Sequence, residues 1–196
     1  NYKTGKEVAV VFDITKQKDA PIKSFSNYEF SADETKILLT TDVKPIYRHS
    51  FTAVYYVWNL VTEELTPLSD KGAQMSPVIS PDGERVAFVR NNNIFIKNLK
   101  FGSESQITWD GEKNKIINGI PDWVYEEEFG FNRAMWWAPN SKFLAFVRFD
   151  ESQVPDFSMP MYAGDQPTFD EFKTYPGEVT FKYPKAGEKK IGRAHV

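Results

Sequence analysis

The sequence predicts an all-β fold, namely part of a β-propeller built from several four-stranded blades, with one short helical insert. Three observations support this prediction. Aromatic residues make up 15% of the 196 residues, and together with the many Val, Ile and Thr they favour strands. A turn motif recurs along the chain, which is typical of repeat architectures. The strand pattern is interrupted once, by an acidic segment in the second half of the chain.

The composition is that of a folded domain. Hydrophobic residues make up 41% and charged residues 26%, which is enough to form a packed core. The net charge is −3 and no basic face is evident, so nucleic-acid binding is not predicted. No run of about 18 apolar residues is present to span a membrane. Cysteine is absent, which excludes disulfides, thiolate catalysis and cysteine-bound metals, and nothing in the sequence indicates a cofactor.

Three segments align as copies of one turn motif: residues 30–39 (FSADETKILL), 79–88 (ISPDGERVAF) and 137–146 (WAPNSKFLAF). In each copy an apolar strand end meets a turn, then a charged residue, then an apolar strand. Pro presets φ in such turns, and Asp, Asn and Gly tolerate their tight geometry. The spacing, near 50 residues, predicts propeller blades. A β-sandwich is the alternative, but its strands need not recur at a long period.

Two further strands are predicted, over 54–60 and 94–99, each after a copy of the turn. Propellers close with about 4–8 blades, so three copies predict that residues 1–188 are part of a larger propeller. Residues 189–196 show no strand pattern. We interpret them as a truncation or a vector-derived tail.

The strand pattern stops between Trp109 and Trp136. Asp122 suits the N-cap of a helix and Gly130 suits its C-terminal end. The sequence therefore predicts a helix of one to two turns that projects from a blade. Three aromatic side chains are expected to anchor it by burial: Trp123, Tyr125 and Phe129.

The predicted helix carries three consecutive glutamates, Glu126, Glu127 and Glu128. Consecutive helical residues lie about 100° apart, so the three cannot share one face, although two neighbours can converge on a small cation. Two close carboxylates repel each other, and a bound ammonium relieves that repulsion. The pattern therefore indicates a site for a free amino terminus, a lysine or an amine. A solvated acidic helix face is the alternative. A calcium site is a third reading, but no Asp-x-Asp spacing supports it, so no metal site is predicted.

A second candidate is Arg48, which lies between two strand signals. Its planar guanidinium suits a carbonyl or carboxylate ligand, and a structural ion pair is an equally open reading. His49 has no nucleophile motif beside it, so packing is the predicted role. No Gly-x-Ser-x-Gly segment occurs, and neither His49 nor His195 has the context of a catalytic triad. No catalytic residue is therefore predicted in this chain.

At these positions the chain resembles the dipeptidyl peptidase IV family, within the prolyl oligopeptidase group of serine peptidases. The segment 122–129 (DWVYEEEF) resembles the family's double-glutamate helix, and residues 48–50 (RHS) with Thr52-Ala53 resemble its arginine loop. Two other stretches are similar to family sequence: 136–139 (WWAP) and 183–187 (YPKAG). The resemblance extends to about Glu188.

The resemblance implies an eight-bladed propeller followed by an α/β-hydrolase domain. By matching positions, Glu127 and Glu128 would bind the free α-ammonium of a peptide, and Arg48 would contact the substrate backbone near its second residue. Glu126 receives no role. The parent would be an exported or periplasmic bacterial serine exopeptidase, forming a homodimer, that removes Xaa-Pro or Xaa-Ala dipeptides. The rivals are a non-catalytic propeller that binds a protein partner and a related endopeptidase.

Overall fold

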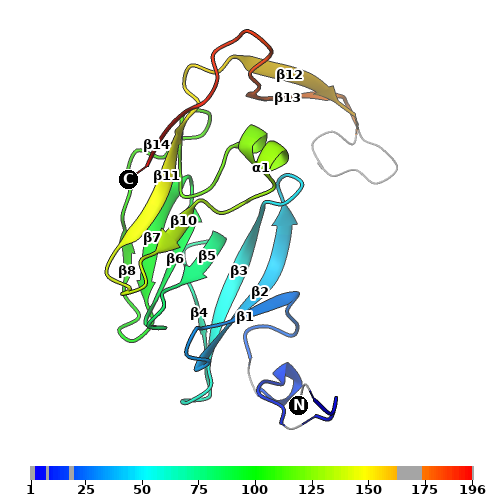
Figure 1. Ribbon diagram of the computed structural model, residues 1–196. Helices are drawn as coiled ribbons and strands as arrows, with labels where there is room; N and C mark the ends of the chain where they lie inside the picture. Colours follow the sequence, from blue (N-terminus) through cyan, green and yellow to red (C-terminus); the bar gives the residue numbers. More distant parts are fainter. Residues whose placement is uncertain (1–2, 8, 18–19, 163–173, 196) are drawn as a thin grey trace.

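The computed structural model describes residues 3–7, 9–17, 20–162 and 174–195 (Figure 1). The first antiparallel sheet has the order β1 (Asn27–Phe30), β2 (Lys36–Pro45), β3 (Phe51–Asn59), β4 (Glu64–Pro67). The second has the order β5 (Met75–Ile79), β6 (Arg85–Arg90), β7 (Asn93–Asn98), β8 (Glu104–Gln106). These two sheets are successive four-stranded blades, as predicted, and β3 and β7 cover most of the two further strands expected from the sequence. A short 3-10 helix, η1 (Ile14–Lys16), precedes them.

The third blade is less regular. It has the order β10 (Met135–Trp137), β11 (Leu144–Asp150), β14 (Gly192–His195), and β9 (Ile116–Asn118) also pairs with β11. Two excursions leave this blade: the helix α1 (Trp123–Phe129) and the hairpin of β12 (Asp156–Met161) and β13 (Gly177–Lys182). Figure 1 shows both on the same end of the molecule. Within the described residues, no helix has the length and apolar character needed to cross a membrane.

The repeated turn has the same hydrogen bonds in all three copies, which confirms the predicted repeat. The first residue donates its N–H to the carbonyl five residues later, at 2.9, 2.8 and 2.8 Å, and its own carbonyl accepts from the residue three positions on. The residue three positions after the first has a positive φ in each copy: Glu34 (55°), Gly83 (69°) and Ser141 (58°). The turn geometry is thus kept although its residue types change.

The three turns also contact one another in sequence order. A Cβ added to Gly83 would lie 3.1 Å from the carboxylate of Asp33 in the first turn. The N–H of Asp82 donates to the Oγ of Ser141 in the third turn, at 3.0 Å. Each turn therefore lies beside the next, as successive blades require.

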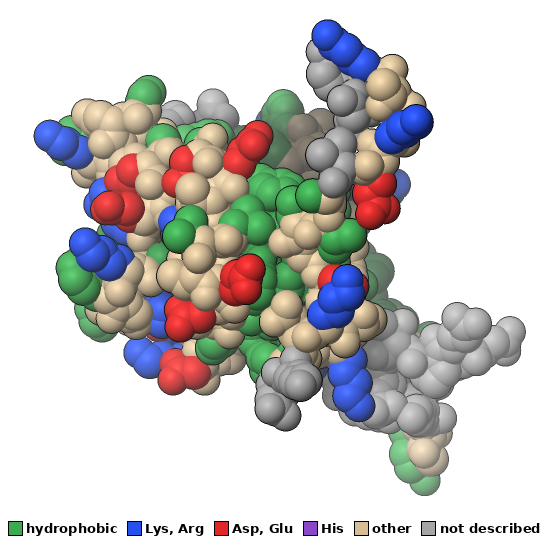
Figure 2. Space-filling view, turned by 90° about the horizontal axis from the view of Figure 1, so that it is seen from below, with side chains coloured by type: hydrophobic (Ala, Val, Ile, Leu, Met, Phe, Trp, Pro, Cys, Tyr) green, Lys and Arg blue, Asp and Glu red, His purple; other side chains and the backbone are tan. Residues whose placement is uncertain are grey.

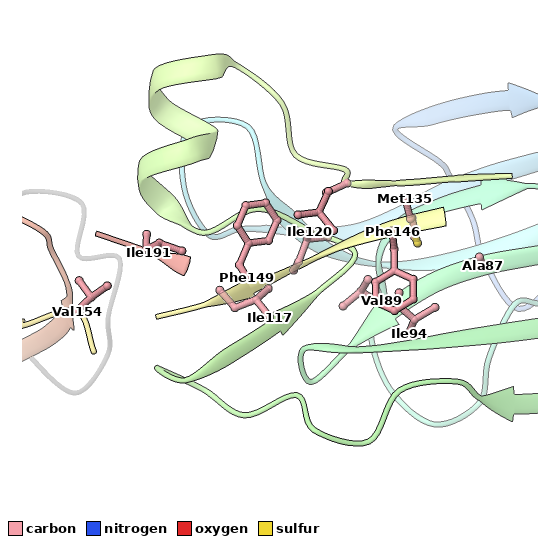
Figure 3. Close-up of a cluster of buried hydrophobic side chains, with 12 residues drawn as sticks. Ala87, Val89, Ile94, Ile117, Ile120, Met135, Phe146, Phe149, Val154 and Ile191 are labelled. Atoms are coloured by element: carbon pink, nitrogen blue, oxygen red, sulfur yellow. The ribbon is translucent and has the colours of Figure 1, made fainter. Parts of the chain in front are cut away.

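The second blade is buried on both faces. Side chains alternate along a strand, so Val86 and Phe88 of β6 point towards the first blade, where they join one apolar cluster. Ala87 and Val89 point towards the third blade and join another, which is drawn in Figure 3. A third cluster packs the N-terminal segment against the first blade. Figure 2 shows hydrophobic side chains gathered in the middle of the lower face, between two flanking parts that carry acidic and basic groups.

The expectation that residues 189–196 lack strand structure is wrong. The strand β14 pairs antiparallel with β11, with Ala194 opposite Arg148, and Ile191 is buried in the cluster of the third blade. Its strand character comes from pairing with a segment more than 40 residues away, which its own residue pattern does not show. Val196 lies outside the described residues. The boundary at residue 188 and the origin of the tail stay predictions.

The helix α1 interrupts one edge strand of the third blade. Asn118 at the end of β9 pairs with Arg148, and Met135 at the start of β10 pairs with Phe146, so both short strands lie along the same edge of β11. Between them, the N–H of Ala134 donates to the carbonyl of Gly119 at 2.8 Å. The predicted break after Trp109 therefore begins later than expected, because β9 falls inside it.

Candidate ammonium-binding site

The ends of α1 are fixed by the caps that the sequence predicts. Asp122 has an extended backbone, and its Oδ2 accepts the N–H of Val124 at 2.8 Å. Gly130 has a φ of 68°, a left-handed conformation that costs glycine little, and its N–H donates to the carbonyl of Glu126 at 2.9 Å. The helix of seven residues thus begins and ends through local contacts.

Two of the three predicted aromatic anchors hold the helix. Trp123 packs on Tyr183 and Phe181 of the hairpin, with ring centroids 5.3 and 6.0 Å away. Tyr125 packs on Phe149 of β11 at 5.3 Å. Phe129, in contrast, is 67% exposed, so its predicted anchoring role is wrong. It is the last residue of the helix, and the ring that it contacts is that of Tyr125 in the preceding turn.

The three glutamates have three different environments. Glu126 is 1% exposed, and its Oε1 accepts the N–H groups of His49 at 2.7 Å and of Ser50 at 2.9 Å. A carboxylate that receives two backbone donors satisfies the rule that buried charge must be hydrogen-bonded. Sequence reasoning gave this residue no role, and no local signal shows that its partners lie 76 and 77 residues earlier in the chain.

Glu127 forms a bidentate ion pair with Arg48. The Nε of Arg48 lies 3.0 Å from Oε2 of Glu127, and a terminal nitrogen lies 2.8 Å from Oε1. The hydrogen bond that Arg48 donates to Glu127, and then the negative charge of Glu127, raises the pKa of Arg48 above its ordinary value. The structure therefore brings together two predicted site residues 79 positions apart. The pair is solvated, with side-chain exposures of 68% for Arg48 and 32% for Glu127.

Glu128 is exposed on the same helix, directly after Glu127. Among the residues that the structure describes, its side chain has no hydrogen-bond partner and no ion pair. Its carboxylate therefore remains available beside a carboxylate that already carries a guanidinium. No group of three or more His, Cys, Asp or Glu in the described ranges is arranged to hold a metal ion.

The loop that carries Arg48 is held through its backbone. The His49 side chain is exposed, so the packing role predicted for it is wrong. Its N–H donates to Glu126, and its carbonyl accepts the Nδ2 of Asn132 at 2.9 Å. The carbonyl of Asn132 in turn accepts the Oγ of Ser76 in β5, at 2.6 Å. Asn132 and Ser76 had no sequence signal. Together these contacts join all three blades at the site.

A hollow of about 150 Å³ lies at the start of α1, and Ser50, Asp122 and Glu151 are among the residues that line it. Burial raises the pKa of Glu151 to about 7; the negative charge of Asp122 adds to the increase, and the ammonium of Lys182 opposes it. Burial also raises the pKa of Asp122. The helix therefore starts over a pair of buried acidic groups with little positive compensation.

A wider cavity of about 700 Å³ opens beside the end of the helix. It is lined by residues of all three blades and of the insert, among them Tyr28, Phe51, Tyr55, Asn132, Arg133 and Trp136. Aromatic faces next to a few polar groups suit a peptide or a similar ligand. Residues 130–133, which follow α1 directly, are among those that line the cavity.

Comparison with known proteins identifies the family. Residues 31–192 match the family model described as the dipeptidyl peptidase IV (DPP IV) N-terminal region. The chain belongs to this family. A solved structure of dipeptidyl peptidase 4 from Porphyromonas gingivalis is 48% identical and has a TM-score of 0.90, with all of this chain and 27% of that chain covered. The DPP IV fold of that structure agrees with the blades described above.

Curated relatives of the family carry two kinds of name. The prolyl endopeptidase FAP of Homo sapiens is 35% identical over 96% of this chain and 24% of its own length. Dipeptidyl peptidase 4 of Sus scrofa is 39% identical over 84% of this chain and 21% of its own length. The chain therefore spans about a quarter of the length of these DPP IV relatives.

Proposed function

We propose that this chain is the substrate-recognition portion of a serine exopeptidase that removes N-terminal Xaa-Pro or Xaa-Ala dipeptides. In this proposal Glu127 and Glu128 bind the free α-ammonium of the peptide. Arg48 holds Glu127 and contacts the substrate backbone near its second residue. Peptides with a free amino terminus are then the ligands of this chain.

The ion pair between Arg48 and Glu127 carries the proposal. It places a guanidinium, a shared carboxylate and the open carboxylate of Glu128 within two neighbouring segments. An ammonium bound there would be hydrogen-bonded by the carboxylates of Glu127 and Glu128. The positive charge of Arg48 reduces the repulsion between these two carboxylates. Hydrogen bonds to charged groups contribute about 1.5–3 kcal/mol each, which is enough to select a charged amino terminus.

The chemistry follows from position. If the amino terminus is held at α1, the distance from this anchor to the attacking group decides which peptide bond is cleaved. Correct placement of two reacting groups supplies a large part of a rate enhancement. A site of this kind converts a general serine hydrolase into an exopeptidase that cleaves at a fixed number of residues from the amino terminus.

The reaction itself needs a second domain, because no Gly-x-Ser-x-Gly segment occurs in this sequence. We propose that a C-terminal α/β-hydrolase domain of the parent chain supplies the triad. An exported or periplasmic location in a bacterium and a homodimeric parent are also part of the proposal, and both rest on the family resemblance. Cell fractionation and sedimentation of the full-length protein test them.

The decisive experiment is the double substitution Glu127→Ala and Glu128→Ala in the full-length protein. We expect kcat/KM for substrates with a free amino terminus to fall by more than a hundredfold, since two charged contacts are lost. Glu84→Gln, at an exposed glutamate of the second blade, is the control and should behave like the wild type. A loss of less than about twofold in the double variant contradicts the proposal.

A second candidate is a proline-directed endopeptidase, because a relative 35% identical to this chain is named prolyl endopeptidase. Internal cleavage does not need the ammonium. The same double variant separates the two: an endopeptidase keeps its activity on an N-acetylated peptide, whereas a strict exopeptidase has none to keep. A non-catalytic partner-binding propeller would show no hydrolase domain in the rest of the parent gene.

A further inference from the structure

We infer that Glu126 is a positioning residue of the ammonium site: its buried carboxylate fixes the arginine loop, residues 46–50, against helix α1. The inference rests on the proposed function and deepens it. It assigns a role to the glutamate that neither substrate nor solvent reaches. Glu126 does not touch the ligand but determines where Arg48 and Glu127 meet.

The geometry is a pair of adjacent contacts between the same two segments. Glu126 accepts the N–H groups of His49 and Ser50, at 2.7 and 2.9 Å, and the next residue of the helix, Glu127, pairs with Arg48. Arg48 is therefore the sequence neighbour of His49, and Glu127 is the sequence neighbour of Glu126. A backbone shift at His49 or at Glu126 moves Arg48 or Glu127 by a similar amount.

Of these two contacts, the hydrogen bonds to Glu126 fix the position of the arginine loop more firmly than the exposed ion pair does. Arg48 is 68% exposed, and an exposed ion pair of long side chains holds its geometry weakly and is screened by salt. Glu126 is 1% exposed and accepts two backbone donors on one oxygen. A charge-assisted hydrogen bond in a low-dielectric environment is stronger and less mobile. The position of the loop is therefore set by Glu126, and the exposed ion pair forms within that frame.

The arginine loop between β2 and β3 is closed by its own backbone hydrogen bonds. The N–H groups of Ile46 and Tyr47 both donate to the carbonyl of Ser50, at 2.9 and 3.3 Å. Asn132 also holds the loop, through the carbonyl of His49, and is itself bound to Ser76 of the second blade. Glu126 and Asn132 thus both hold this peptide segment, and the contact of Glu126 with Ser50 is buried, whereas that of Asn132 is exposed.

The test uses the full-length protein and three variants: Glu126→Ala, Glu126→Gln and Asn132→Ala. Glu126→Ala leaves two inward-facing N–H groups without an acceptor. We expect it to raise KM for free-amino-terminus substrates by about tenfold or more, with a smaller change in kcat, because a displacement near 1 Å at such a site can cost up to about a hundredfold in rate. Glu126→Gln keeps an oxygen acceptor and should restore KM to within about threefold.

A purely structural role predicts a different result. It would lower the activity on every substrate in parallel, including a small ester that needs no ammonium anchor, and Glu126→Gln would not restore KM selectively. Amide hydrogen exchange adds an independent readout: exchange should accelerate at His49 and Ser50 in Glu126→Ala and leave the central strand β6 unchanged. A wild-type KM in a folded Glu126→Ala variant, or a uniform loss on all substrates, overturns the inference.

If Glu126→Ala does not fold, Asn132→Ala decides, since it removes a single exposed hydrogen bond to the same loop. It should raise KM by about twofold to threefold at unchanged kcat, given the modest strength of one such bond; an unchanged KM overturns the inference. The proposed function fails separately. Full activity in the Glu127/Glu128 double variant refutes the ammonium site itself, whereas loss there with a silent Glu126→Ala refutes only the positioning role.

Discussion

The second and third blades differ in the strand that precedes the repeated turn: it is continuous in the second blade and interrupted in the third. In the second blade β5 runs along β6 as one strand, with a register shift after Met75. In the third blade the equivalent edge of β11 is shared by β9 and β10, and the chain leaves between them to form α1. The difference shows that an edge strand can be opened to form a helical insert while the strand behind it remains paired along its length.

The first prediction concerns a core substitution in the second blade, the regular one of the two. Phe88 is fully buried and stacks on Phe95 with ring centroids 5.8 Å apart. Phe88→Ala should lower the free energy of unfolding by about 3–5 kcal/mol, because it leaves a cavity between the first two blades. Urea denaturation measures this loss. Phe101→Ala, at a ring that is 75% exposed, is the control and should cost little. A small loss for Phe88→Ala would mean that the blades are not tightly packed.

The second prediction concerns the hollow at the start of α1. The pKa of Glu151 is raised from an ordinary 4.5 to about 7. Between these values the folded chain holds a proton that the unfolded chain has lost, so stability falls as the pH rises through this window and stays lower above it. Glu151→Gln should therefore stabilise the fold by about 3 kcal/mol at pH 8 and by almost nothing below pH 4.5.

Thermal unfolding at the two pH values measures this difference. Glu84→Gln, at an exposed glutamate, is the matched control and should show no pH-dependent gain. An equal effect of Glu151→Gln at pH 4.5 and pH 8 would show that burial, and not ionisation, is responsible.

The third and smallest prediction sharpens the comparison at the repeated turn. Ser80 is fully buried, donates its Oγ to Asp82 and accepts the N–H of Arg85 at 3.0 Å. Ser80→Ala should cost about 1 kcal/mol in chemical denaturation, the net value of a buried hydrogen bond. Ser152 makes the same serine–aspartate contact with Asp150 at an exposed site. Ser152→Ala should therefore change stability by less than about 0.5 kcal/mol. Equal costs at both serines would contradict the role of burial.

The parts of the fold that were predictable are those with local causes. The turns after Ser31, Ser80 and Ala138 are specified by residues within five positions. The caps of α1 are likewise specified by Asp122 and Gly130, at its two ends. For these features the sequence carries the whole physical reason, so the repeat, the blades and the helix were expected correctly.

The features that sequence reasoning missed have distant causes. Glu126 is buried because His49 and Ser50, far away in the chain, present two N–H groups to it. β14 is a strand because β11 offers it an edge. Phe129 resembles an anchor by composition, but whether it is buried depends on what the end of the helix meets in space. Long-range pairings of this kind have no signature in a single sequence.

The hydrogen bond between Ala134 and Gly119 closes the base of the insert. An excursion that leaves and re-enters a strand through one hydrogen-bonded pair adds no register shift to the blade below it. Its length and contents can therefore change while the neighbouring strands keep their partners. The insert and the paired strands of the blade are in this way separable stretches of chain, and the fourteen residues between the two ends form a natural unit for loop exchange between relatives.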